Sequence, residues 1–432
     1  MSLYKRISKM FSIQILGQLI IVVEKLIVPP LIITKFGTSG FGEWTLIRSI
    51  PMYFQMIDFG FFTISGNKLI EAKSNHDVKT EKQIIANSIL FSAIIFIIVL
   101  LSAILLYLID IGKLLNVEHN EYFNMCVLVS FMYVQLYLIS QLYFSFLRGV
   151  HKHVEASSII TRFKLIELIV MVVSFYFGES FLFTITSILL TRLMSIITLH
   201  NAFTKNFSFS ILDVKKHIDT KQFVNIVKGG GASSIFSLSQ LYSSQLTIIL
   251  IASLISTSAV GMFQAIKIIS GLLVQLSGVF NRTLLSEFCI LFNDNKIKLI
   301  RSIYFKSQAF LYLVGLIFIF IVYLYSDLIF TMWLGDDFVV DSKVLLLISL
   351  SSCFYMWWYF SSTVLVATNH YALLTYPIIY NLIFFSIIIY PMTKYFGLYG
   401  CGISLLIFET INIIITKFKL HIFWKTNENN IL

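Results

Sequence analysis

The stretch Ile94-Ile-Phe-Ile-Ile-Val-Leu-Leu-Ser-Ala-Ile-Leu-Leu106 contains no charged residue and no regular alternation of polar and apolar side chains. Strands of a membrane β-barrel alternate over about ten residues, so this stretch does not fit one. It belongs to a longer apolar segment, 84–109, and a helix needs about 20 such residues to cross a bilayer. We therefore predict a membrane-spanning helix here.

Comparable apolar segments recur along the whole chain. Of its 432 residues, 57% are hydrophobic and 12% are charged, whereas soluble domains carry about 25% charged residues. The sequence therefore predicts an all-α integral membrane protein with about twelve spanning helices. The expected spans are 11–34, 42–66, 84–109, 122–147, 156–177, 180–200, 230–252, 258–281, 304–326, 343–366, 372–392 and 398–416.

Lys and Arg gather on one side of these spans, by about four to one. Short cytoplasmic loops are enriched in Lys and Arg, so both termini are expected in the cytoplasm. The first apolar segment is long and lacks a small-residue cleavage site, which indicates a retained helix rather than a removed signal peptide. The net charge of +10 is explained by this topology, and no nucleic-acid partner is expected.

The sequence carries no signature of a cofactor or of an enzyme active site. Its four cysteines are isolated and lie in or beside apolar segments, which argues against a disulfide framework and against a metal site. No metal-ligand cluster, nucleophile–base pairing or Walker loop is present. We therefore expect no cofactor, no catalytic residue and no intrinsic ATP hydrolysis.

An internal repeat divides the chain. The segment Thr38–Arg48 resembles Thr257–Lys267 at an offset of 219 residues, which aligns Arg48 with Lys267. The same offset aligns the third predicted span with the ninth and the sixth with the twelfth. Parallel repeats of this kind are typical of two-lobed transporters. We predict a six-helix lobe at 1–206, a cytoplasmic linker with a short amphipathic helix at 207–228, and a second six-helix lobe at 229–432.

Three short motifs resemble those of polysaccharide flippases of the MOP exporter superfamily, which translocate O-antigen and capsule repeat units. The motifs are Phe36-Gly-Thr-Ser-Gly-Phe-Gly-Glu-Trp44, Ile57-Asp-Phe-Gly-Phe61 and Ser258-Ala-Val-Gly-Met-Phe263. The resemblance implies a MATE-like, two-lobed fold in the bacterial inner membrane. It implies transfer of undecaprenyl-pyrophosphate-linked oligosaccharide from the cytoplasmic to the outer leaflet. Membrane lipid, polysaccharide polymerase or assembly proteins, and H⁺ or Na⁺ coupling are the partners it suggests.

Four charged residues lie deep within predicted spans: Glu24, Lys25, Arg48 and Lys267. A charge inside a membrane is costly, so each marks a candidate functional position. Their cations suit a pyrophosphate, and the resemblance implies cavity cations on the first, second and eighth helices with an acid on the first. The alternative is that these side chains have structural partners or snorkel to the interface.

Further polar residues complete the predicted site. Gln240 and Ser244 belong to a polar stripe that is suited either to sugar hydroxyls or to hydrogen bonds between helices. Asp58 is a candidate for cation coupling or for a structural hydrogen bond. Arg192 and Glu409 are candidates for a gate, with separate local partners as the alternative.

Two other functions compete with the flippase. An ion-coupled multidrug or metabolite antiporter of the same fold would favour acidic residues, whereas cations outnumber acids among the mid-membrane positions here. A membrane polysaccharide polymerase or glycosyltransferase would be expected to have a large, basic outer loop. The longest predicted outer connections, 110–121 and 327–342, are short and rather acidic.

Overall fold

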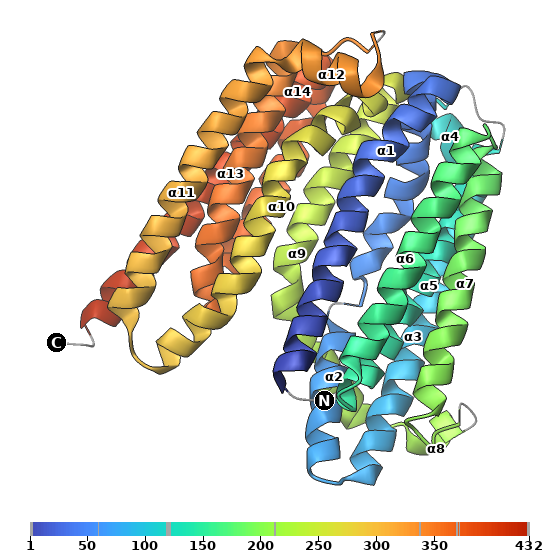
Figure 1. Ribbon diagram of the computed structural model, residues 1–432, viewed down its shortest axis with the longest axis vertical. Coiled ribbons are helices and arrows are strands. Elements are labelled where there is room, and N and C mark those ends of the chain that lie inside the picture. Colours follow the sequence, from blue (N-terminus) through green and yellow to red (C-terminus); the bar gives the residue numbers. More distant parts are fainter. Residues whose placement is uncertain are drawn as a thin grey trace. The chain divides into compact units, whose positions relative to one another are not determined.

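The computed structural model describes residues 3–58, 60–117, 122–210, 213–336, 338–368, 370 and 372–429. All regular secondary structure in these ranges is helical. The chain forms two compact units, which we call unit 1 (Met1–Ser234) and unit 2 (Ile235–Leu432) (Figure 1). Each unit is described by itself below.

Unit 1 is built around a central helix, α5, which packs against α1, α2, α3, α6 and α7. Its apolar core includes Phe61, Leu69 and Phe146, all fully buried. The elements of unit 1 are α1 (Leu3–Met52), η1 (Tyr53–Met56), α2 (Phe61–Ser74), α3 (Val78–Leu108), α4 (Ile111–Leu114), α5 (Phe123–Gly149), α6 (His153–Tyr176), α7 (Phe181–Thr204) and α8 (Val214–His217). Helix α9 (Thr220–Leu254) begins in this unit and ends in unit 2.

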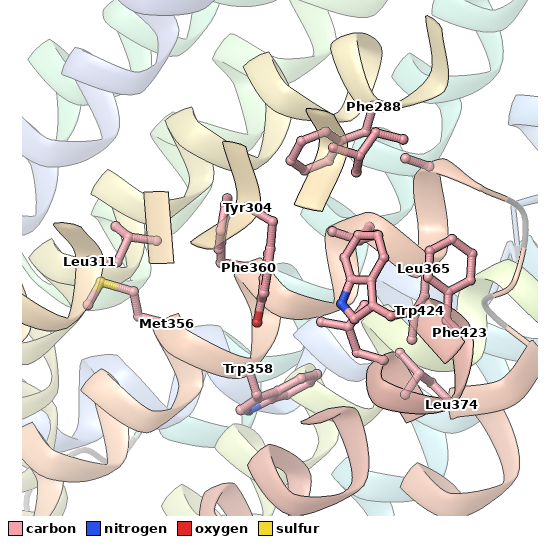
Figure 2. Close-up of a cluster of buried hydrophobic side chains, with 14 of the residues drawn as sticks. Phe288, Tyr304, Leu311, Met356, Trp358, Phe360, Leu365, Leu374, Phe423 and Trp424 are labelled. Atoms are coloured by element: carbon pink, nitrogen blue, oxygen red, sulfur yellow. The ribbon is translucent and has the colours of Figure 1, made fainter. Parts of the chain in front are cut away.

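Unit 2 has an equivalent central helix, α13, which packs against α10, α11 and α14. Figure 2 shows its large aromatic core, in which the rings of Tyr304 and Phe360 stack with centroids 5.8 Å apart. The remaining elements are α10 (Thr257–Asn293), α11 (Ile297–Leu324), α12 (Ser326–Leu334), α13 (Ser342–Ala367) and α14 (Ala372–Asn429).

Eight helices in the described ranges are long and apolar enough to cross a membrane. Two of them contain an internal glycine with non-helical dihedral angles, Gly37 in α1 and Gly397 in α14. Each of these glycines separates two of the predicted spans. The chain is therefore a multi-pass helical membrane protein, and the number of twelve crossings and the side on which the termini lie remain predictions.

The predicted span 42–66 is interrupted, and the interruption follows Pro51, a residue type that breaks helices. Helix α1 ends at Met52, one residue after Pro51, whose ring leaves no N–H for the helical hydrogen bond. A 3₁₀ turn follows, and the chain reaches α2 through Gly60, whose φ of 72° is left-handed. Glycine adopts this conformation without the clash that a Cβ would cause.

The segment predicted as a linker, 207–228, also has a different structure from the one expected. Helix α8 has only four residues, and α9 begins at Thr220, inside the segment predicted as linker. Helix α9 then continues through Gly229–Gly231, three consecutive glycines that have low helix propensity. Asp219 explains this early start, because its Oδ1 accepts a hydrogen bond from the backbone N–H of Gln222 at 3.0 Å. Asn87 of α3 donates to the Asp219 carbonyl at 3.1 Å and so holds the segment against unit 1.

The internal repeat extends over both units. Helices α3 and α11 begin 219 residues apart, at Val78 and Ile297. The same separation relates the first residues of α5 and α13, of α6 and α14, and of the second part of α1 and α10. It also relates Gly178 to Gly397, and both have positive φ. The break at 53–60 is the exception, since α10 runs without interruption through the equivalent positions.

Candidate functional site

An ion pair joins the two parts of α1 in unit 1. Arg48 Nη1 lies 2.5 Å from Glu24 Oε1, and the two side chains are 38% and 17% exposed. The Arg48 guanidinium also lies 5.8 Å from the ring centroid of Trp44, one turn earlier on the same helix. Burial of a lone carboxylate in a span would be costly, so the pair stabilises both charges. It also engages Nη1 of the guanidinium group that was a candidate for binding pyrophosphate.

Lys25 lies beside this pair but has an exposed side chain. It interacts electrostatically with Glu24 and Arg48. At about 100° per residue, Lys25 shares one flank of α1 with Gln14 and Gln18. The exposed apolar residues Ile15 and Leu19 lie on another flank. Lys25 therefore does not lie on the exposed apolar flank of α1, which is the flank suited to contact lipid.

A second ion pair of unit 1 is almost fully enclosed. Arg192 Nη2 of α7 lies 2.8 Å from Glu167 Oε2 of α6, with both side chains about 5–6% exposed. Arg192 also donates to the Tyr133 hydroxyl at 2.6 Å, and that hydroxyl donates to Glu167 Oε2 at 3.0 Å. Arg192 thus has local partners within unit 1.

Three residues of this region were missed at the sequence level: Tyr133, Lys164 and Glu167. The signal was present, because Lys164 and Glu167 both lie inside the predicted span 156–177 and are three residues apart, on one side of a helix. In the structure, Lys164 lies within α6 and interacts electrostatically with Glu24, Arg192, Arg48 and Glu167.

Asp58 occupies the break between η1 and α2. Its backbone carbonyl accepts a hydrogen bond from the Phe61 N–H at 2.7 Å. Its carboxylate interacts electrostatically with the backbone N–H groups of Gly60 and Phe62, at the start of α2, where N–H groups lack partners within the helix. The geometry agrees with the structural alternative for Asp58, while a coupling role remains a hypothesis.

Unit 2 repeats the arrangement around Arg48 with different partners. Lys267 Nζ donates to Ser244 Oγ at 2.9 Å and lies 5.5 Å from the ring centroid of Phe263. Glu409 accepts a hydrogen bond from the Trp358 indole N–H at 2.6 Å and interacts electrostatically with Lys267. The side chain of Gln240 lies outside the described residues.

The predicted site residues thus fall into two groups. Glu24, Lys25 and Arg48 gather in unit 1, whereas Lys267 and Ser244 gather in unit 2. Arg192 and Glu409 each bind partners of their own unit, so their contacts give no support to a mutual gate. Within the described ranges, no three His, Cys, Asp or Glu side chains gather as a metal site.

No protein-family model and no curated protein matches the chain. Solved structures match over almost its full length. A multidrug-resistance MATE family transporter of the MOP superfamily, in an inward-facing conformation, aligns with a TM-score of 0.76, 11% identity, and coverage of 94% of this chain and 96% of that one.

Two further solved structures also align with the chain over almost its full length. The lipid II flippase MurJ, in an inward closed conformation, gives a TM-score of 0.69 and 12% identity over 97% of this chain and 87% of that one. A variant of the MATE transporter VcmN from Vibrio cholerae gives a TM-score of 0.62 and 16% identity, over 99% of this chain and 97% of that one. The chain therefore has the fold of MATE-type transporters and of MurJ.

Proposed function

We propose that this protein is a flippase that moves undecaprenyl-pyrophosphate-linked oligosaccharide repeat units from the cytoplasmic to the outer leaflet by alternating access. The observation that carries the proposal is the local group of charges around Glu24 and Glu167 in unit 1, in which cations outnumber carboxylates. Four cations surround two carboxylates there: Lys25, Arg48, Lys164 and Arg192 around Glu24 and Glu167.

This excess favours an anionic substrate. A pyrophosphate diester carries about two negative charges, and charge-assisted hydrogen bonds from Lys or Arg are about twice as strong as neutral ones. Lys267 adds a cation in unit 2, where Ser244 supplies a hydroxyl. A cation in a low-dielectric region is stabilised by a nearby anion. An antiporter for cationic drugs would need the opposite balance.

Deletion of the gene in its host is the first test. We expect complete undecaprenyl-pyrophosphate-linked repeat units to accumulate and surface polysaccharide to disappear. Wild type should restore both when expressed at matched levels, and Lys25→Ala, Arg48→Ala and Lys267→Ala should not. Lys35→Ala is the matched control, because Lys35 is an exposed lysine on the same helix as Lys25.

The outcomes separate the competing functions. Rescue by all three charge-deleted variants would leave the flippase in place and move the substrate site elsewhere. Unchanged lipid-linked pools and normal surface polymer in the deletion strain would rule out the flippase and favour drug or metabolite export. Loss of polymer length alone, with repeat units still delivered to the outer leaflet, would indicate a polymerase.

A further inference from the structure

Lys164 points toward the interior of unit 1. The exposed apolar side chains of α6 lie along one flank and include Leu165, Ile169 and Val173. Its buried side chains lie on the opposite flank and include Glu167 and Met171. At about 100° per residue, Lys164 falls on the buried flank. Its own side chain is only partly buried. Lys164 is therefore an inward-facing cation rather than a loop residue or a lipid-facing one.

Two carboxylates and two guanidinium groups interact electrostatically with Lys164. They belong to Glu24, Glu167, Arg48 and Arg192. Helices α1 and α6 pack closely here (Figure 1), since a Cβ added to Gly17 would lie 3.6 Å from Thr161 Oγ1, one turn before Lys164. Among the described residues, no carboxylate lies within the 4.0 Å ion-pair distance of Lys164 Nζ.

The two carboxylates are already engaged by arginines. Glu24 holds Arg48 at 2.5 Å and Glu167 holds Arg192 at 2.8 Å. Each arginine can donate a fork of hydrogen bonds to its carboxylate, which a lysine cannot match. The charges within each ion pair cancel. The excess positive charge in this group therefore comes from Lys25 and Lys164. Both flank the Glu24–Arg48 pair. A cation in this position favours an anion as its partner.

We infer that Lys164 is an additional anion-binding residue, which contacts a phosphate of the substrate while Arg48 and Arg192 hold the two carboxylates. This inference rests on the proposed function and names a residue of its substrate site. A diphosphate group supplies the two charges that Lys25 and Lys164 leave unbalanced. The flexible stem of lysine lets its ammonium follow a phosphate as the substrate moves.

Binding to the full-length protein in nanodiscs tests the inference. The ligands are undecaprenyl pyrophosphate, undecaprenyl monophosphate and inorganic pyrophosphate. The variants are Lys164→Ala, Lys164→Arg and the control Arg162→Ala, which removes an exposed cation two residues away on the same helix. We expect Lys164→Ala to raise the Kd for undecaprenyl pyrophosphate about tenfold, Lys164→Arg to restore most of the affinity, and Arg162→Ala to match wild type.

A structural role for Lys164 predicts a different result. Lys164→Ala would then lower the Tm, and Lys164→Arg would not restore the affinity for undecaprenyl pyrophosphate, which would overturn the inference. Wild-type binding of undecaprenyl pyrophosphate with no change in Lys164→Ala would also overturn it, while the proposed function would stand. Lys164-dependent binding of inorganic pyrophosphate without binding of either lipid would support an anion site but overturn the lipid-linked substrate.

Discussion

Arg48 and Lys267 occupy equivalent positions of the repeat, and each cation lies over the aromatic ring four residues earlier on its own helix. The separations are 5.8 Å to Trp44 and 5.5 Å to Phe263. Their polar partners differ, because Arg48 pairs with a carboxylate and Lys267 with the hydroxyl of Ser244. Replacement of Lys267 therefore removes a cation that binds a hydroxyl, whereas replacement of Arg48 breaks an ion pair.

Replacement of Lys267 by methionine should slow transport about tenfold, because a hydrogen bond to a charged group contributes about 1.5 kcal/mol. Lys267→Arg should retain most of the activity, since the charge is kept. The measurement is delivery of lipid-linked repeat units in a complemented deletion strain. Equal rates for the methionine and arginine variants would show that the charge of Lys267 does not matter.

The Glu24–Arg48 pair should contribute modestly to stability. Because Arg48 is 38% exposed, we expect a coupling energy of about 1 kcal/mol, above that of a typical surface pair and below that of a fully buried one. Comparison of Glu24→Gln, Arg48→Gln and the double variant in a thermal-unfolding cycle measures this coupling. Additive single effects would contradict the interaction.

Loss of one member of the enclosed Glu167–Arg192 pair should lower the free energy of unfolding far more. Glu167→Ala leaves an unpaired buried guanidinium and should cost about 3–5 kcal/mol of unfolding free energy. Glu167→Ala combined with Arg192→Leu should recover part of this loss, since no buried charge is left alone. Thermal unfolding in detergent checks both variants. A Glu167→Ala protein as stable as wild type would contradict the enclosed pair.

The break between η1 and α2 should depend on Gly60. Its φ of 72° lies in the left-handed region, so Gly60→Ala should cost about 1–2 kcal/mol. Gly271→Ala is the matched control, because a Cβ at this helical glycine meets no atom within 4 Å. That variant should gain about 0.5–1 kcal/mol from helix propensity. Equal effects of the two variants on Tm would contradict the left-handed turn.

Protonation of the Asp77 carboxylate at low pH should lower the free energy of unfolding. It lies in the turn before α3, where the hydroxyl and backbone N–H of Thr80 donate to its carboxylate at 2.6 and 3.0 Å. These hydrogen bonds lower the pKa of Asp77 below its usual value. A depressed carboxyl pKa stabilises the folded state above the unfolded pKa of about 3.9, and this stability is lost as pH falls through the folded pKa.

Asp77→Ala should therefore have a lower Tm than wild type at pH 7, and the difference should shrink as the pH falls below about 3.9. Thermal unfolding of both proteins between pH 7 and pH 3 measures the difference. A gap that stays constant over this range would show that the carboxylate charge is not responsible.

The sequence by itself determined the helical membrane class and the repeat. Apolar runs such as 84–109 predicted α3 to within a few residues at its end, because a spanning helix is defined by local hydropathy. The match of Thr38–Arg48 to Thr257–Lys267 located equivalent helix starts, since both follow from local pattern. The candidate residues Glu24, Lys25 and Arg48 were also found from the sequence, because a charge inside an apolar run is conspicuous.

Only the tertiary structure decided which charges are paired. Glu24 meets Arg48 and Glu167 meets Arg192 because separate helical segments pack together, and the facing directions of such segments are set by contacts distant in sequence. The inward direction of Lys164 depends likewise on which flank of α6 is buried. Pro51 indicates a break in the span 42–66, but the left-handed turn at Gly60 could not be predicted, because hydropathy continues across it. Hydropathy shows which segments of the chain can span a membrane, whereas the packing of the helices decides which side chains come into contact.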